Sequence, residues 1–154
     1  MQTEELLEAW NRHHRINIYV LDNIHESHLL DRWDVDSPHV GMQFAQLHGI
    51  RRMWLQVGAA DLWEQTKEID RKKVNYKAYL REQLNESALA MSTFLQQGLE
   101  QNKIKGFKAG PINFLAYLIS LESHHRSEIL STLKSQGREI SEDLEFGMWD
   151  WTKR

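Results

Sequence analysis

The chain has 154 residues, a length that fits one domain with a core large enough to fold without disulfide bonds. It contains no cysteine, which excludes thiolate metal ligands and a cysteine nucleophile and leaves histidine, carboxylates or water for any transition-metal site. The net charge is −3 with basic and acidic residues interspersed, so no basic stripe predicts a nucleic-acid partner.

The sequence shows no sign of export or of a membrane span. Its first stretch, MQTEELLEAW, is acidic and amphipathic, unlike a signal peptide. Charged residues interrupt the apolar stretches everywhere, so we expect no membrane partner. A cytoplasmic protein is therefore predicted.

The first predicted helix runs from Thr3, its N-cap, to Leu30. One side of this segment carries apolar residues at helical spacing together with His14 and Asn17. The segment is rich in histidine, and we interpret most of these rings as surface or boundary groups. We expect His14 to point into a polar pocket.

The second predicted helix begins at Ser37 and Pro38, with Ser37 as its cap, and extends to about Val57. His48 lies inside its apolar face, and Arg51 follows about one turn later. A salt bridge to a neighbouring acid is the commoner role for an arginine at such a position. Catalysis is the alternative.

The middle of the chain contains a predicted short helix over residues 59–67 and a long helix over residues 75–101, with Asn75 as its cap. Gly106 to Gly110 is the clearest loop. It leads into the last long helix.

This last helix, Asn113 to Lys134, combines an apolar stripe with the chain's only His-His-Arg run. Pro111 suits its first turn, and Gly137 suits a C-terminal stop. His125 falls in the apolar stripe, whereas His124 is turned away by about 100°. From this helix alone, a hydrogen-bonded core histidine is the favoured interpretation of His125.

The tail after Gly137 contains Trp149 and Trp151, which we expect to pack as a lid over one end of the molecule. Four long helical patterns, short loops and no strand pattern predict an all-α, antiparallel up-down four-helix bundle with short extra helices. The whole chain is predicted to form this single domain.

Three stretches carry a family resemblance: VGMQFAQLHGIRRMWL, AYLISLESHHRSEILSTLKSQG and FGMWDW. They resemble the DinB/YfiT-like family of metalloenzymes, and the resemblance covers nearly the whole chain. It implies a four-helix bundle, often a homodimer, with zinc or nickel held by three histidines, two of them in an HxxxH motif on the last long helix. By this resemblance His48 and His125 are metal ligands.

The chain departs from the family pattern at Leu121, which stands where the first histidine of HxxxH would be. A leucine cannot bind a cation, so two family ligands remain and metal binding is expected to be weakened. His14, Asn17 or water are candidates for completing the shell.

Two functions follow from the resemblance. The first is a metal-dependent enzyme of the thiol-transferase or isomerase type, using a low-molecular-weight thiol, in which Arg51 or Arg126 holds an anionic small-molecule substrate. The alternative for Arg126 is an i,i+4 salt bridge with Glu122. The second function is a dimeric bundle that has lost metal chemistry and serves as a binding or stress-associated scaffold, with Leu121 lining a core or pocket.

Overall fold

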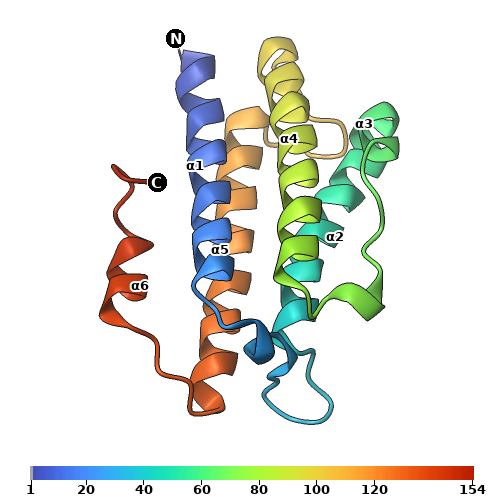
Figure 1. Ribbon diagram of the computed structural model, residues 1–154. Coiled ribbons are helices and arrows are strands. Elements are labelled where there is room, and N and C mark those ends of the chain that lie inside the picture. Colours follow the sequence, from blue (N-terminus) through green and yellow to red (C-terminus); the bar gives the residue numbers. More distant parts are fainter. Residues whose placement is uncertain (1) are drawn as a thin grey trace.

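The computed structural model describes residues 2–154 and is all-α. Within this range it has no β-strand and only an isolated bridge between Ile104 and Phe107. The four long helices lie alongside one another as a helical bundle (Figure 1). In chain order the elements are α1 (Gln2–Asp22), η1 (Glu26–Leu30), α2 (Val40–Gly58), α3 (Ala60–Glu64), η2 (Arg71–Lys73), α4 (Lys77–Gln101), α5 (Pro111–Ser135) and α6 (Glu142–Gly147).

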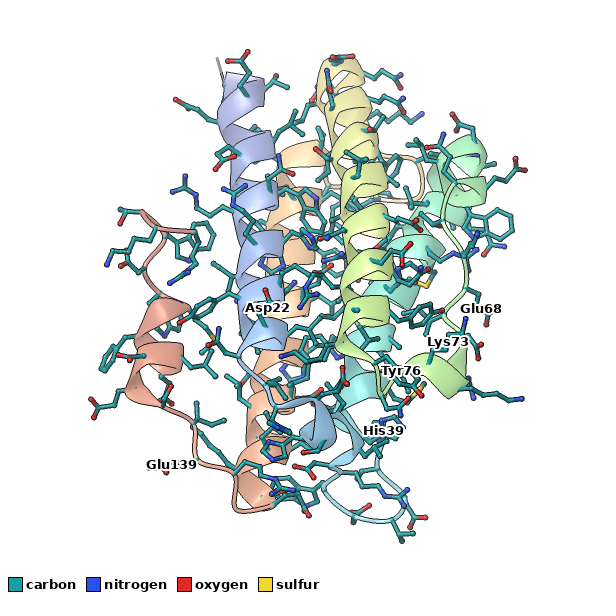
Figure 2. The ribbon with its side chains drawn as sticks, viewed as in Figure 1. Asp22, His39, Glu68, Lys73, Tyr76 and Glu139 are labelled. Atoms are coloured by element: carbon teal, nitrogen blue, oxygen red, sulfur yellow. The ribbon has the colours of Figure 1, made fainter. Side chains whose placement is uncertain are left out.

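Helix α4 contacts each of the other long helices, α1, α2 and α5. Its first turns are also tied to the end of α1 through Asp22, which Figure 2 labels. Arg81 Nε donates to Asp22 Oδ1 at 2.9 Å, and Lys77 Nζ donates to the Asp22 carbonyl at 2.9 Å. None of the helices in residues 2–154 is both long enough and apolar enough to span a lipid bilayer.

The buried apolar residues form two separate clusters, one toward each end of the bundle. On α1 the first cluster contributes Val20 and the second contributes Trp10; on α5 the corresponding residues are Ile129 and Leu118. Polar side chains that are also buried occupy the levels between these positions: His13, His14, Asn17, Arg51, Ser87 and Glu122. A polar layer therefore crosses the middle of the bundle.

The first helix is shorter than the sequence pattern predicts. It ends at Asp22, and a 3-10 helix, η1, occupies only the last 5 residues of the predicted span. The interruption lies at His25, whose backbone is extended and whose ring Nδ1 accepts a hydrogen bond from Ser27 N at 3.3 Å. A side-chain cap of this kind starts a new turn and stops α1 from continuing.

The predicted start of the second helix at Ser37 is also wrong. Ser37 Oγ instead donates to Asp34 Oδ1 at 2.8 Å, within the turn that precedes the helix. His39 is the N-cap of α2, and its Nδ1 accepts from Met42 N at 3.2 Å. Histidine is an unusual cap, which is why a search for Ser, Thr, Asp or Asn selects the wrong residue.

The boundaries of the other elements agree with the sequence to within a few residues. The short helix α3 covers Ala60–Glu64, and α4 begins after Tyr76, so Asn75 is not its cap. Pro111 occupies the first turn of α5, as predicted. Gly137 has φ 73°, the left-handed conformation expected of a glycine that ends a helix.

The C-terminal segment lies along the side of the bundle, next to α1 and α5 (Figure 1). Tyr19 on α1 holds it, since its hydroxyl donates to the Asp143 carbonyl at 2.9 Å and its ring stacks against the Arg154 guanidinium at 3.8 Å. The indole of Trp149 is 78% exposed. The prediction that Trp149 packs down as a lid over a bundle end is therefore wrong.

Two glycines of α2 offer a matched test of this packing. We expect Gly41→Ala to lower the free energy of unfolding by about 1–3 kcal/mol, because the new methyl group would overlap the Val74 carbonyl. Gly49→Ala should raise it by about 0.5–1 kcal/mol, since nothing lies within 4 Å of the added carbon and alanine favours the helix. Urea unfolding measures both changes; equal effects of the two substitutions would contradict the close approach at Gly41.

Candidate functional site

The polar layer is centred on an ion pair between Arg51 of α2 and Glu122 of α5, and both side chains are fully buried. Arg51 Nε donates to Glu122 Oε2 at 2.9 Å, and Nη2 donates to Oε1 at 2.7 Å. Two parallel bonds between a planar guanidinium and a carboxylate form the strongest ion-pair geometry available to side chains. The pair joins α2 to α5 in the middle of the bundle.

Side chains of α1 complete the surroundings of the carboxylate. Asn17 Nδ2 donates to Glu122 Oε1 at 2.9 Å, and His13 Nε2 lies 3.2 Å from the same oxygen. Because a carboxylate only accepts, His13 carries its proton on Nε2. Burial lowers the pKa of His13 by more than the neighbouring Glu122 charge raises it, so the ring is neutral.

The remaining N–H groups of Arg51 face α4 and α1. Nη1 donates to the Leu84 carbonyl at 2.9 Å and to Ser87 Oγ at 3.2 Å. The guanidinium also lies over the Trp10 ring, 5.1 Å from its centroid. Arg51 therefore contacts all the other long helices of the bundle from one position.

Glu122 is ionised in this environment. Burial by itself would raise the pKa of its carboxyl, but the charge and hydrogen bonds of Arg51, helped by His13, together lower it well below the ordinary range. The buried centre thus holds a full negative and a full positive charge. Each needs the other, since an unpaired charge at such a site is strongly destabilising.

His14 occupies the polar pocket that the sequence predicts for it. Its Nε2 donates to Asn85 Oδ1 at 2.7 Å, and its Nδ1 lies 3.4 Å from Arg51 Nη2 as the acceptor. Burial, and then the Arg51 charge, lower the pKa of His14 to about 3. A second proton on His14 would have to bind at Nδ1, next to the positively charged Arg51 guanidinium, which disfavours protonation of the ring.

Arg126 connects the polar layer to a surface groove. Its Nη1 donates to Asn17 Oδ1 at 2.6 Å, and its Nη2 donates to Ser123 Oγ at 3.3 Å. The groove, of about 540 Å³, lies between α5 and the C-terminal segment. Its lining residues are Ile119, Ser123, Arg126, Ser127, Leu130, Ser131, Lys134, Glu145, Met148, Trp149 and Trp151.

The structure brings four of the residues singled out in the sequence into one network: His14, Asn17, Arg51 and Arg126. Leu121 is only partly buried and is not part of this network. The expected salt bridge from Glu122 to Arg126 is replaced, because Glu122 is bonded to Arg51 and Arg126 to Asn17 and Ser123. The expected ion pair of Arg51 is present, with Glu122 as the acid.

Sequence reasoning did not place His13 in the network, and it considered Glu122 as a partner of Arg126 rather than of Arg51. Glu122 follows Leu118 by four positions and precedes Ile129 by seven, which places it on the buried face of its helix. A lone carboxylate on an apolar face was the available signal, since such a group requires a buried cation. For His13, the sequence offered no comparable signal.

His48 lies on another side of α2. Its Nε2 lies 2.6 Å from the Lys67 carbonyl and donates to it. This bond directs the ring toward the segment that follows α3, although His48 is turned by only about 60° on α2 from Arg51, which bonds to Glu122 of α5. Burial lowers the pKa of its ring.

His125 is one-fifth exposed, and its Nδ1 lies 3.6 Å from Glu128 Oε2. The Nδ1 atoms of His48 and His125 are both buried and accept no hydrogen bond from the protein. Residues 2–154 include no group of three His, Cys, Asp or Glu side chains arranged to hold a metal ion. The residues present thus fit the three-ligand metal centre poorly, and ligand roles for His48 and His125 stay a prediction.

Comparison of the sequence and structure with protein-family models, curated proteins and solved structures gives no significant match.

The first test of the polar layer is a double-mutant cycle on its ion pair. Arg51→Met and Glu122→Leu should each lower the free energy of unfolding by about 3–5 kcal/mol, because each leaves a buried charge alone. The double variant should lose much less than the sum of the two. Urea unfolding measures the cycle, with the exposed Arg81–Asp22 pair as the control, expected to couple by less than about 1 kcal/mol. Additive losses at Arg51 and Glu122 would contradict the pairing.

A second test uses pH. His14 has its pKa lowered by folding, so its neutral form contributes stability above the unfolded pKa of about 6.5, and this is lost as pH falls toward the folded value of about 3. His14→Gln should therefore lose about 2 kcal/mol less stability between pH 7 and pH 5 than the unmodified protein. Unfolding by urea at the two pH values measures this difference. His124→Gln, at a largely exposed ring, is the control, and an equal effect there would refute the assignment.

Proposed function

We propose that this protein is a DinB-like, antiparallel up-down four-helix bundle that binds a small molecule without metal chemistry. The observation that carries the proposal is the Arg51–Glu122 pair, fully buried and bidentate, at the centre of the bundle. Its carboxylate accepts from Arg51, Asn17 and His13, so its oxygens are already engaged by the protein. The centre is built to hold the helices together.

The groove beside Arg126 supports the choice of binding as the function. A volume of about 540 Å³ is in the range of sites for small molecules. Apolar side chains of α5 and of the C-terminal segment line it together with three serines and three charged side chains, so the groove offers both apolar surface and polar anchors. Arg126 is positioned there by Asn17, so one polar group is already oriented toward a ligand.

The arrangement of the helices and the assembly are part of the same proposal. The residue pairs Gln43–Thr132 and Arg51–Glu122 support opposite directions for α2 and α5, because the residue number increases along α2 while that of its partner on α5 decreases. For a homodimer the support is a set of exposed apolar side chains on α2 and α5: Met53, Val57 and Tyr117. A cytoplasmic location is part of this proposal, and the net charge of −3 without a basic stripe supports the lack of a nucleic-acid partner.

The second candidate is the metal-dependent thiol transferase or isomerase. The specific observation in its favour is that His48 Nδ1 and His125 Nδ1 are buried and have no hydrogen-bond partner in the protein, a state that a bound cation would relieve. Leu121 supplies no donor, and the separate contacts of the two rings, with the Lys67 carbonyl for His48 and with Glu128 for His125, weaken this candidate. In this case zinc or nickel and a thiol would be the cofactors.

A thermal-shift screen of small molecules tests the binding function. Compounds that raise the Tm of the unmodified protein should lose their effect on Ser127→Trp, because the new indole fills the groove. The same compounds should still raise the Tm of Ser120→Trp, because Ser120 is also an exposed residue of α5 but lies outside the groove. A screen without stabilising compounds, or shifts that survive Ser127→Trp, would refute binding in this groove.

Elemental analysis of untagged protein decides between the two candidates. The binding proposal expects removal of divalent metal by a chelator to leave the Tm unchanged. Near-stoichiometric zinc or nickel that disappears in both His48→Ala and His125→Ala would instead establish the metal centre.

A further inference from the structure

Arg126 is a partly buried cation for which the protein provides no direct counter-ion. Within residues 2–154 no carboxylate oxygen lies within 4.0 Å of its guanidinium nitrogens, whereas Arg12, Arg15, Arg51, Arg81 and Arg138 each have such a contact. Its protein acceptors are the neutral oxygens of Asn17 and Ser123. Of the five N–H groups of a guanidinium, these use only part, and the side chain lines the groove.

Both walls of the groove carry apolar side chains. Leu130 and Ile119 belong to α5, and Met148, Trp149 and Trp151 to the C-terminal segment. Trp149 is 78% exposed, so its indole has a free face that can pack against a ligand. A molecule that bridges these walls would bury apolar surface that is in contact with water in the free protein.

The charges of the groove favour a single negative charge on the ligand. Besides Arg126, the charged lining residues are Lys134 and Glu145, whose Nζ and Oε1 atoms lie 3.1 Å apart. This pair is internally neutral, so Arg126 supplies the net charge of the groove. A dianion would meet only one free cation and would also face the Glu145 carboxylate.

We propose that the groove binds a monocarboxylate with an aromatic or branched apolar body, its carboxylate on Arg126 and its body between Leu130 and Trp149. This inference rests on the proposed binding function and names the ligand class. A planar carboxylate matches the parallel N–H groups of a guanidinium, as a cation or a neutral group does not. Asn17 acts as a positioning residue, since its bond to Arg126 orients the guanidinium.

The probes for the test are 4-phenylbutanoate, the uncharged 4-phenylbutanamide and the cationic 4-phenylbutylamine, titrated into the full chain by calorimetry. The acid should bind roughly tenfold more tightly than the amide, the difference expected for one charge-assisted contact, and the amine should bind least. Arg126→Gln should remove the preference for the acid. Arg81→Gln, at an arginine of an exposed ion pair, is the matched control and should retain the preference for the acid.

A second pair of variants tests the apolar wall. Trp149→Ala should weaken the binding of the acid and of the amide by the same factor, because the indole is proposed to contact the apolar body that the two compounds share. Trp33→Ala, at another exposed tryptophan outside this groove, should change neither affinity. Both indoles are exposed, so these variants are expected to fold.

Three outcomes would overturn the inference: equal binding of acid and amide by the unmodified protein, an acid preference that survives Arg126→Gln, or no binding of the acid up to about 10 mM. In each case, compounds that raise the Tm of the unmodified protein but not of Ser127→Trp would leave the binding function standing. A screen without such compounds would refute both.

Discussion

The buried pair of Arg51 and Glu122 constrains the rest of the structure. Charges removed from water must be fully hydrogen-bonded, and neither residue can meet this requirement alone. Arg51 reaches the Leu84 carbonyl and Ser87 of α4, while Glu122 accepts from Asn17 and His13 of α1. All the long helices are therefore connected through a single pair of side chains, and the apolar clusters pack on either side of it.

Such a layer acts more on which structure forms than on how stable it is. A buried ion pair adds little net stability compared with well-packed apolar residues, but it penalises any packing that separates its partners. Sliding α5 by one turn relative to α2 would leave Glu122 among apolar side chains, whereas a slide within the Leu-rich clusters would exchange one hydrophobic contact for another. The polar layer thus sets the register of helices whose apolar stripes alone would allow several.

Apolar spacing was sufficient to predict the all-α class and where in the chain the four long helices lie, because these depend on residues close together in the chain. The wrong boundaries lie at His25 and His39, where a histidine ring caps the backbone in place of the usual Ser or Asp. In the site, His14 and Arg51 could be chosen because polar residues on apolar faces are conspicuous. Their contacts could not be predicted, since Arg51 lies 37 residues from His14 and 71 residues from Glu122, and these pairings depend on how the helices meet.

The polar layer and the groove share one side chain, and this links the stability of the bundle to its surface. Asn17 donates to Glu122 through Nδ2 and accepts from Arg126 through Oδ1, so the two ends of one amide hold the buried carboxylate and the groove cation in fixed positions. Glu122 also gives Arg126 a negative charge nearby, which opposes the lowering of the Arg126 pKa by burial. The cation can thus remain charged at the wall of the groove without a carboxylate of its own. An arginine that is held in this way has little rotational freedom left to lose when it meets an anion, and that is the property that distinguishes a built binding site from a surface charge.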